Sequence, residues 1–411
     1  MSQTLEFHPL TFVADRDGVT VGRPDTESYA VLPADGAELL RHLADGMSVT
    51  AAADWYLATF GERIDMTDFT TTLADLGFLR AAGEEPATAP PVRYRKLGRA
   101  LFSAPAWICY AAIIVAACVA MAAHPRLRPG PQLVFFSSSL ILVQIVLTVV
   151  QMPAMCLHEW FHVMAGRRLG LPTKLSTGRR FYFFVFETHL SGLLGVPKRK
   201  RYLPFLAGIL ADLVAFCGLV LIAAAASPTD SSWLARVALA VAFTVLLRLG
   251  WQGLIFIRTD PYYALTTWLG CTNLTGASSA YLRHRLGRLA GLRRLAGLRR
   301  LARRGPGGPS WTDEEAWSPR DRAMARWFAL ISVVGCGGLL VLLGLAVVPV
   351  GVSFTSRLVS GLIHGTLGDA QFWDATVTAA VLAVQVAVLP LLAGRRGQQP
   401  IDSSAHSEVS A

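Results

Sequence analysis

Six apolar runs of about twenty residues divide most of the chain and constrain its fold more than any other feature. They lie near 105–123, 133–155, 203–226, 234–257, 327–350 and 373–393. A helix of about twenty apolar residues matches the thickness of the hydrocarbon core of a bilayer. The composition agrees, since 53% of the 411 residues are hydrophobic and 16% are charged. We therefore predict a mainly α-helical, polytopic membrane protein with about six transmembrane helices.

Basic residues indicate which loops face the cytoplasm. The net charge is +10, and its surplus lies in the loops 166–201 and 258–326, whereas the loops near 124–132, 227–233 and 351–372 contain few charges. Lysine and arginine mark the cytoplasmic side of a membrane protein. The start of the chain also lacks the apolar core of a signal peptide. We expect a multi-pass protein of the cell membrane with both termini in the cytoplasm, in contact with the lipid bilayer and not with nucleic acid.

A histidine-rich motif lies at the end of the second apolar run. His158, Glu159 and His162 form the pattern H-E-x-x-H within Gln151–Arg168. In a helix, residues four apart lie on one face, so both imidazoles can bind one tetrahedral Zn²⁺. Glu159 can then serve as the general base of a metallopeptidase. The alternative is a chance match on a polar helix, but ionisable groups beside a membrane span are functional by default.

The topology brings a second polar motif to the same membrane depth. The second and fourth apolar runs both cross from outside to inside, so their cytoplasmic ends carry His158 and Asp260. These two motifs, about a hundred residues apart in sequence, can therefore meet. Six cysteines lie singly in or beside apolar runs, and we interpret them as small buried hydrophobes rather than disulfides or ligands.

Residues 1–85 have the pattern of a small soluble module. Alternating segments at Leu10–Val13, Val19–Gly22 and Tyr29–Leu32 predict short strands. Helices are predicted at Gly36–Ala44, after an N-cap at Ser48, and after Asp65 or Thr67. Together they indicate a winged-helix-like α/β domain. Its many aspartates and glutamates argue against a DNA-binding winged helix, because phosphate contacts need basic residues.

The module resembles PqqD-like domains, which recognise leader peptides of ribosomally made, modified peptides. The resemblance is carried by Tyr29-Ala-Val-Leu-Pro-Ala-Asp-Gly-Ala-Glu-Leu-Leu, by Leu43-Ala-Asp-Gly, and by the spacing of Phe69, Leu73, Leu76 and Leu79. It implies that a leader peptide adds as an extra strand beside the small sheet. A purely structural cap is the alternative.

The membrane part resembles the site-2 protease family, in particular the branch of putative peptide zinc metalloproteases. The likeness spans roughly 133–275 and rests on His158-Glu-Trp-Phe-His162, Ala207-Gly-Ile-Leu-Ala-Asp212 and Asp260-Pro-Tyr-Tyr-Ala-Leu265. It implies that Asp260 is the third zinc ligand. Two residues depart from the family pattern: Pro261 replaces a usual Gly, and Phe161 replaces a small residue and could narrow the substrate groove.

Two further sites compete for a place near the metal. Asp212 lies within the third apolar run, where a lone carboxylate must be paired; we expect it to contact a ligating histidine, with third ligand as its alternative role. The aromatic segment Phe181–His189 predicts a strand or hairpin, and it contains Glu187 and His189. A structural hairpin with a surface histidine explains this segment equally well, so neither residue joins the primary site.

The remaining boundaries follow composition. We predict a linker at 86–100, a zinc metalloprotease core at 101–275, a basic cytoplasmic loop at 276–326, a C-terminal pair of transmembrane helices at 327–395 and a disordered tail at 396–411. The loop contains the repeat Leu-Ala-Gly-Leu-Arg-Arg within Leu286–Arg304, which indicates a cationic, lipid-facing or poorly ordered helix held near anionic headgroups.

The sequence thus predicts a membrane-embedded zinc metalloendopeptidase with Zn²⁺ on His158, His162 and Asp260 and with Glu159 as the base. By resemblance, its substrate is a ribosomally made precursor peptide held by its leader, with a peptide exporter as a possible partner. One alternative is a site-2-type protease that cleaves a transmembrane regulator. Another is a non-catalytic protein that binds a peptide for export. Co²⁺ or Fe²⁺ could occupy the same ligands.

Overall fold

A computed structural model describes residues 4–15, 18–26, 28–81, 83–84, 91–180, 183–189, 192–226, 232–293, 309–313 and 316–394. Within these ranges, only the backbone is described for 174–180, 183–189, 289–293 and 388–394. The predicted tail 396–411 and most of the repeat in Leu286–Arg304 lie outside the described residues.

Five helices among the described residues are long and apolar enough to cross a membrane. They are α5 (Ala104–Ala123), α6 (Leu140–Arg168), α7 (Lys198–Ala226), α8 (Trp233–Gln252) and one continuous helix over Pro319–His364. The prediction of a mainly helical, multi-pass membrane protein is confirmed at this level. The sixth predicted segment, near 373–393, lies in α14 (Ala370–Gly394), which is helical but is not among those five.

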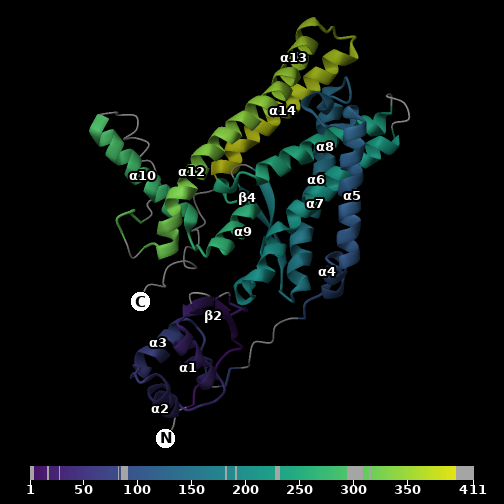
Figure 1. Cartoon of the computed structure of the whole chain (residues 1–411). Coiled ribbons are helices and arrows are strands. Elements are labelled where there is room, and N and C mark those ends of the chain that lie inside the picture. Colours follow the sequence, from purple (N-terminus) through teal and green to yellow (C-terminus); the bar gives the residue numbers. More distant parts are fainter. Residues whose placement is uncertain are drawn as a thin grey trace.

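The long helix corrects the predicted outer loop at 351–372. It consists of α12 (Pro319–Leu342), the π-helical η5 (Leu343–Val347) and α13 (Val348–His364). The helix therefore continues to His364, and α14 runs back beside α13 (Figure 1). Polar residues after 350 end the apolar run without ending the helix. One of them, Arg357, lies over the ring of Phe135, with its guanidinium carbon 4.4 Å from the ring centroid.

Helix α7 occupies the centre of the membrane part and packs against α5, α6, α8 and α9 (Asp260–Leu269). Its neighbour α8 presents buried alanines, which let the helix backbones approach closely. Further elements flank or connect these helices. They are α4 (Arg95–Leu101), η1 (Pro125–Leu127), η2 (Pro131–Val134), η4 (Ile255–Ile257) and α10 (Leu274–Arg293).

Helix α4 falls in the segment predicted as the linker 86–100. It packs against α6, and a Cβ added to Gly98 would lie 2.5 Å from the carbonyl oxygen of Met164. Gly98 therefore permits a close approach of the backbones of α4 and α6. The basic composition of this segment gave no sign of that contact. The end of the predicted linker is thus a helix fixed to the helix that carries the histidines.

The N-terminal module has the predicted three strands and three helices. They are β1 (Thr11–Asp15), β2 (Gly18–Arg23), β3 (Ser28–Leu32), α1 (Ala34–Ala44), α2 (Val49–Phe60) and α3 (Met66–Asp75). The strands form an antiparallel sheet in the order β1-β2-β3. Ser48 and Asp65 act as the predicted N-caps, since their side chains accept hydrogen bonds from Ala51 N and Thr67 N. The fully buried side chains of Val21, Leu40, Leu73 and Phe78 form the core.

The module packs against the membrane part at η3 (Leu193–Gly195). This turn lies beside β1 and β2, and a Cβ added to Gly195 would lie 2.8 Å from Thr11 Oγ1. The buried Arg201 holds η3 from the other side by donating to the carbonyl oxygens of Leu194 (2.7 Å) and Val196 (2.6 Å). The module therefore contacts a turn that is itself held through its backbone carbonyl oxygens by Arg201 of α7.

A hairpin lies between the histidine helix and η3. Strands β4 (Lys174–Arg180) and β5 (Phe183–His189) pair antiparallel, with Lys174 opposite His189, and both contact α6. This confirms the predicted strand or hairpin for 183–189, while residues 181 and 182 of the predicted segment lie outside the described residues. The side chains of Glu187 and His189 lie outside the described part of the chain.

A buried carboxylate fixes the loop that follows α9. Asp321, at the start of α12, is 1% exposed and accepts hydrogen bonds from Thr272 Oγ1 (2.8 Å), Asn273 N (3.1 Å) and Ser318 Oγ (2.8 Å). It thereby ties α12 to the segment that joins α9 and α10. Because α9 begins with Asp260, this contact also helps to place the third candidate ligand.

Replacing Asp321 with alanine should destabilise the protein by ~2–3 kcal/mol, because several donors lose a charged acceptor in a buried place. Thermal unfolding in detergent measures the effect. Asp313→Ala is the matched control, since Asp313 is exposed and only eight residues away. Equal melting temperatures for the two variants would contradict the structural role of Asp321.

Candidate metal centre

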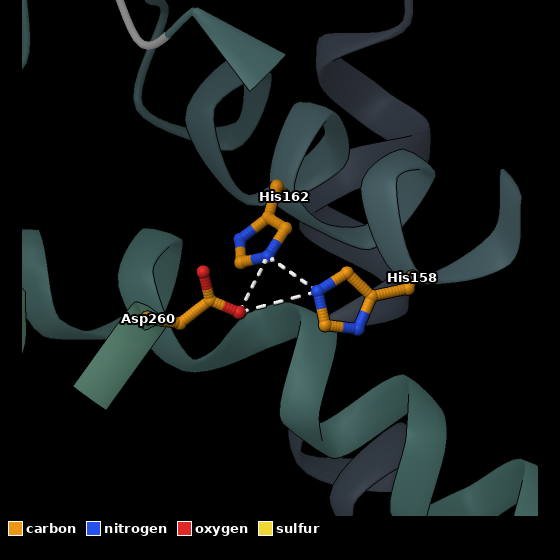
Figure 2. A group of neighbouring side chains, drawn as sticks. All are labelled: His158, His162 and Asp260. Atoms are coloured by element: carbon orange, nitrogen blue, oxygen red, sulfur yellow. Dashed lines mark hydrogen bonds and ion pairs between the residues drawn. The ribbon is translucent and has the colours of Figure 1, made fainter. Parts of the chain in front are cut away.

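Three side chains from two helices converge on one point. His158 and His162 belong to α6, and Asp260 is the first residue of α9 (Figure 2). Oδ2 of Asp260 lies 3.2 Å from Nε2 of His158 and 3.3 Å from Nε2 of His162. The two Nε2 atoms are 3.2 Å apart. The three atoms thus form a nearly equilateral triangle.

The size of this triangle matches a tetrahedral metal site. Ligands at ~2.0–2.1 Å from a zinc ion at tetrahedral angles lie ~3.3–3.4 Å from one another. The observed separations of 3.2–3.3 Å agree with that value. Three ligands of this kind leave a fourth position for water or substrate, as in catalytic zinc sites.

The hydrogen bonds of the imidazoles direct their free nitrogens inward. Nδ1 of His158 lies 3.0 Å from Oδ2 of Asp212, and Nδ1 of His162 lies 2.6 Å from the carbonyl oxygen of Pro204. Both acceptors require Nδ1 to carry the hydrogen, which assigns the tautomer and leaves Nε2 with a lone pair. Two imidazole nitrogens and a carboxylate oxygen then face one another, an arrangement suited to holding a cation between them.

Asp260 supports the same reading from its own surroundings. Its Oδ2 atom is buried and has no hydrogen-bond partner among the described residues. Burial alone would raise the pKa of Asp260, whereas two protonated imidazoles at this distance would lower it well below its usual range; positive charge among the three groups is therefore what keeps the carboxylate ionised. Its side chain is 26% exposed, against 7% for each histidine. The site therefore opens on the side of Asp260.

One stripe of α7 forms the back of the site. Pro204, Gly208 and Asp212 follow at intervals of four and lie on one face of the helix. Because α6 and α7 run in opposite directions, Pro204 meets His162 and Asp212 meets His158. Between them, a Cβ on Gly208 would lie 2.3 Å from Nε2 of His162 and 2.4 Å from Nε2 of His158. Only glycine leaves the space in front of both nitrogens free.

A strained turn presents Asp260. Arg258 ends η4 with φ 60° and ψ 48°, a left-handed conformation that is unfavourable for a residue with a side chain. Thr259 then occupies the N-cap position of α9 without a side-chain capping hydrogen bond, and its Oγ1 instead donates to the carbonyl oxygen of Gln252 (2.8 Å). Pro261 lies in the first turn of α9, where its missing N–H costs no helical hydrogen bond. The departure from glycine at this position is therefore compatible with the helix.

Phe161 lies in an apolar cluster of the core and not along an open groove. It is 6% exposed and packs with Phe102 and Tyr110, whose ring centroids lie 5.9 Å and 6.3 Å away. Ala207 and Ala211 of α7 belong to the same apolar cluster. The expectation that Phe161 narrows an open groove is thus wrong, because small alanines on α7 accommodate the ring inside the core.

The other predicted residues have distinct places. Glu159 follows His158 on α6 and is half-buried. Asp212 is 1% exposed and contacts His158 at Nδ1, on the side of the ring away from the triangle. It therefore belongs behind the histidine rather than among the three converging groups.

Sequence reasoning missed Pro204 and Arg248 as parts of this centre, and it included Gly208 only within the motif Ala207-Gly-Ile-Leu-Ala-Asp212, without a role. Gly208 lies four residues before Asp212, so its place on the same helical face was available from the spacing. Arg248 is one of two arginines, with Arg236, in the apolar run 234–257, and a charge within such a run is itself a signal of function. Pro204 contributes its backbone carbonyl oxygen, and no pattern of side chains in the sequence indicates such a role.

Comparisons of the chain with protein-family models, with curated proteins and with solved structures found no match. The candidate metal centre is therefore argued from its own geometry. The arrangement provides two imidazoles and one carboxylate on a preformed triangle, with one side open.

Proposed function

We propose that the protein is a membrane-embedded metallopeptidase that hydrolyses a peptide bond of a precursor peptide. The observation that carries the proposal is the triangle of His158, His162 and Asp260, with separations of 3.2–3.3 Å and both Nδ1 atoms held from behind. Two imidazoles and one carboxylate favour Zn²⁺. Glu159, which a purely structural metal site would not need, favours a catalytic site over a non-catalytic one.

His158, His162 and Asp260 would hold the ion and leave one position free. When bound, Zn²⁺ supplies a Lewis acid that polarises a peptide carbonyl and lowers the pKa of a water molecule. Glu159 accepts a proton from the attacking water and passes it to the nitrogen of the leaving amine. The buried face of α7 excludes water from behind the histidines, while the partial exposure of Asp260 leaves room for the peptide.

The N-terminal module would capture the leader of the precursor. This part of the proposal is supported by the contact of β1 and β2 with η3, which begins only four residues after β5 ends. A peptide paired to an edge of the small sheet would be held close to the hairpin β4–β5, and this hairpin contacts α6. We place both termini in the cytoplasm of a cell, and a peptide exporter is a plausible partner for the cleaved product.

Glu159→Gln should abolish peptide hydrolysis while leaving metal binding intact. General base catalysis contributes ~10²–10⁴-fold to rate, and glutamine has the shape of glutamate but cannot accept the proton. The detergent-purified, zinc-loaded protein is incubated with a library of peptides from a cell digest. New termini are then identified by mass spectrometry, and zinc is measured in the same samples.

The wild type should generate new termini with a common local sequence, and Glu159→Gln should not. Equal cleavage by both proteins would exclude Glu159 as the base. Cleavage by neither zinc-loaded protein would contradict the peptidase proposal.

A further inference from the structure

An arginine lies behind the candidate metal centre, near the C-terminal end of an apolar helix. Arg248 belongs to α8 and directs its guanidinium group towards α7 and α6. Nε donates to Oδ2 of Asp212 at 2.9 Å, and Nη2 donates to Oδ1 of the same carboxylate. The pair is therefore a two-pronged contact between a planar guanidinium and a carboxylate.

The guanidinium also reaches the histidine helix. Nη1 lies 3.4 Å from Oε1 of Gln151, and Nη2 lies 3.4 Å from the carbonyl oxygen of Ala154. Gln151 and Ala154 precede His158 by seven and four residues, so all three lie on one face of α6. One side chain thus contacts the two helices that build the back of the metal centre.

The carboxylate that Arg248 holds is also the partner of His158. Asp212 is 1% exposed, and its Oδ2 accepts from both Arg248 Nε and His158 Nδ1. A buried carboxylate within a membrane span is costly unless it is paired, and a freely rotating one would not present the same oxygen to the imidazole. The two contacts from Arg248 pair this carboxylate with a guanidinium group and fix its rotation.

We propose that Arg248 is a positioning residue of the metal centre: it orients Asp212, which orients His158 so that Nε2 faces the ion. The proposal rests on metal binding at His158, His162 and Asp260. It assigns to α8, which supplies none of the three candidate ligands, control over the affinity and geometry of the site. It also requires the planar fork of arginine, because the single ammonium of lysine cannot contact both oxygens in this way.

Metal affinity and the Co²⁺ absorption spectrum test the proposal in the full-length, detergent-purified protein. The variants are Arg248→Gln, Arg248→Lys and Asp212→Asn, and zinc affinity is measured by competition with a chromophoric chelator. Loss of a group that orients a ligating histidine weakens metal binding by ~10–100-fold. We expect such a loss for Arg248→Gln, a smaller one for Arg248→Lys, and a changed Co²⁺ spectrum in both.

Two further variants separate positioning from general damage. Arg236→Gln is the matched control, since Arg236 is an exposed arginine on the same helix. It should bind zinc as the wild type does. The double variant Asp212→Asn/Arg248→Gln should lose little more affinity than Asp212→Asn alone, because Arg248 acts through Asp212.

The results that would overturn the proposal are distinct from those that would overturn the proposed function. If the wild type binds zinc and Arg248→Gln keeps the same affinity and Co²⁺ spectrum, Arg248 has no positioning role. Additive losses in the double variant would also reject action through Asp212. If the wild type takes up neither zinc nor cobalt, the assignment of the metal centre is rejected, and the proposed role of Arg248 is rejected with it.

Discussion

Gly208→Ala is expected to abolish metal binding, although it adds a single methyl group. That methyl carbon would lie 2.3 Å and 2.4 Å from the Nε2 atoms of His162 and His158, in the space that an ion needs. Contacts this short force α7 away from α6 or rotate both imidazoles. Either movement breaks the triangle of ligand atoms. Zinc content after purification and zinc affinity by chelator competition measure the effect.

Gly218→Ala provides the control for this prediction. Gly218 lies on the same helix, and a Cβ added there meets no atom within 4 Å. This variant should bind zinc normally and melt at or slightly above the wild-type temperature, since alanine favours a helix. Normal zinc affinity in Gly208→Ala would contradict the placement of α7 against the two histidines.

Asp260→Ala should weaken zinc binding much more than Asp212→Asn does. Asp260 contributes one of the three ligand atoms, whereas Asp212 contacts only the outer nitrogen of His158. For the loss of such an outer partner we expect ~10–100-fold weaker binding. Loss of a direct ligand should exceed this range and leave the purified protein nearly free of zinc.

The same comparison distinguishes the two candidates for the third ligand. Both proteins are purified side by side without chelator, and their zinc contents and affinities are compared. If Asp212→Asn loses zinc and Asp260→Ala retains it, the third ligand is Asp212, within the membrane span, and not Asp260. That outcome would reject the arrangement of α6 and α9 described above.

Much of the fold could be predicted because its signals are local. Apolar length identified the membrane helices, and Ser48 and Asp65 marked helix starts in the N-terminal module through their capping chemistry. The long helix over Pro319–His364 was missed because polar residues after 350 interrupt hydropathy but not helical hydrogen bonding. Hydropathy reports the lipid environment, and it does not report where a helix ends.

Membrane topology predicted which ligand residues could meet, but it did not predict the residues that surround them. The directions of the second and fourth apolar runs indicated that His158 and Asp260 lie at one depth, and the structure places their ligand atoms 3.2 Å apart. The contacts of Gly208 and Arg248 depend on how α7 and α8 rotate about their axes. Packing of side chains from several helices sets that rotation, and no single segment of sequence contains it.

The most direct measurement is the zinc content of the detergent-purified protein, prepared without chelator and analysed together with His162→Ala. The proposed site requires about one zinc ion per wild-type chain, because three preformed ligands converge on one position. The variant should contain little, since one of those ligands is gone. A wild-type protein that holds no zinc and takes up none when zinc is supplied would contradict the assignment of the metal centre and of the peptidase activity derived from it.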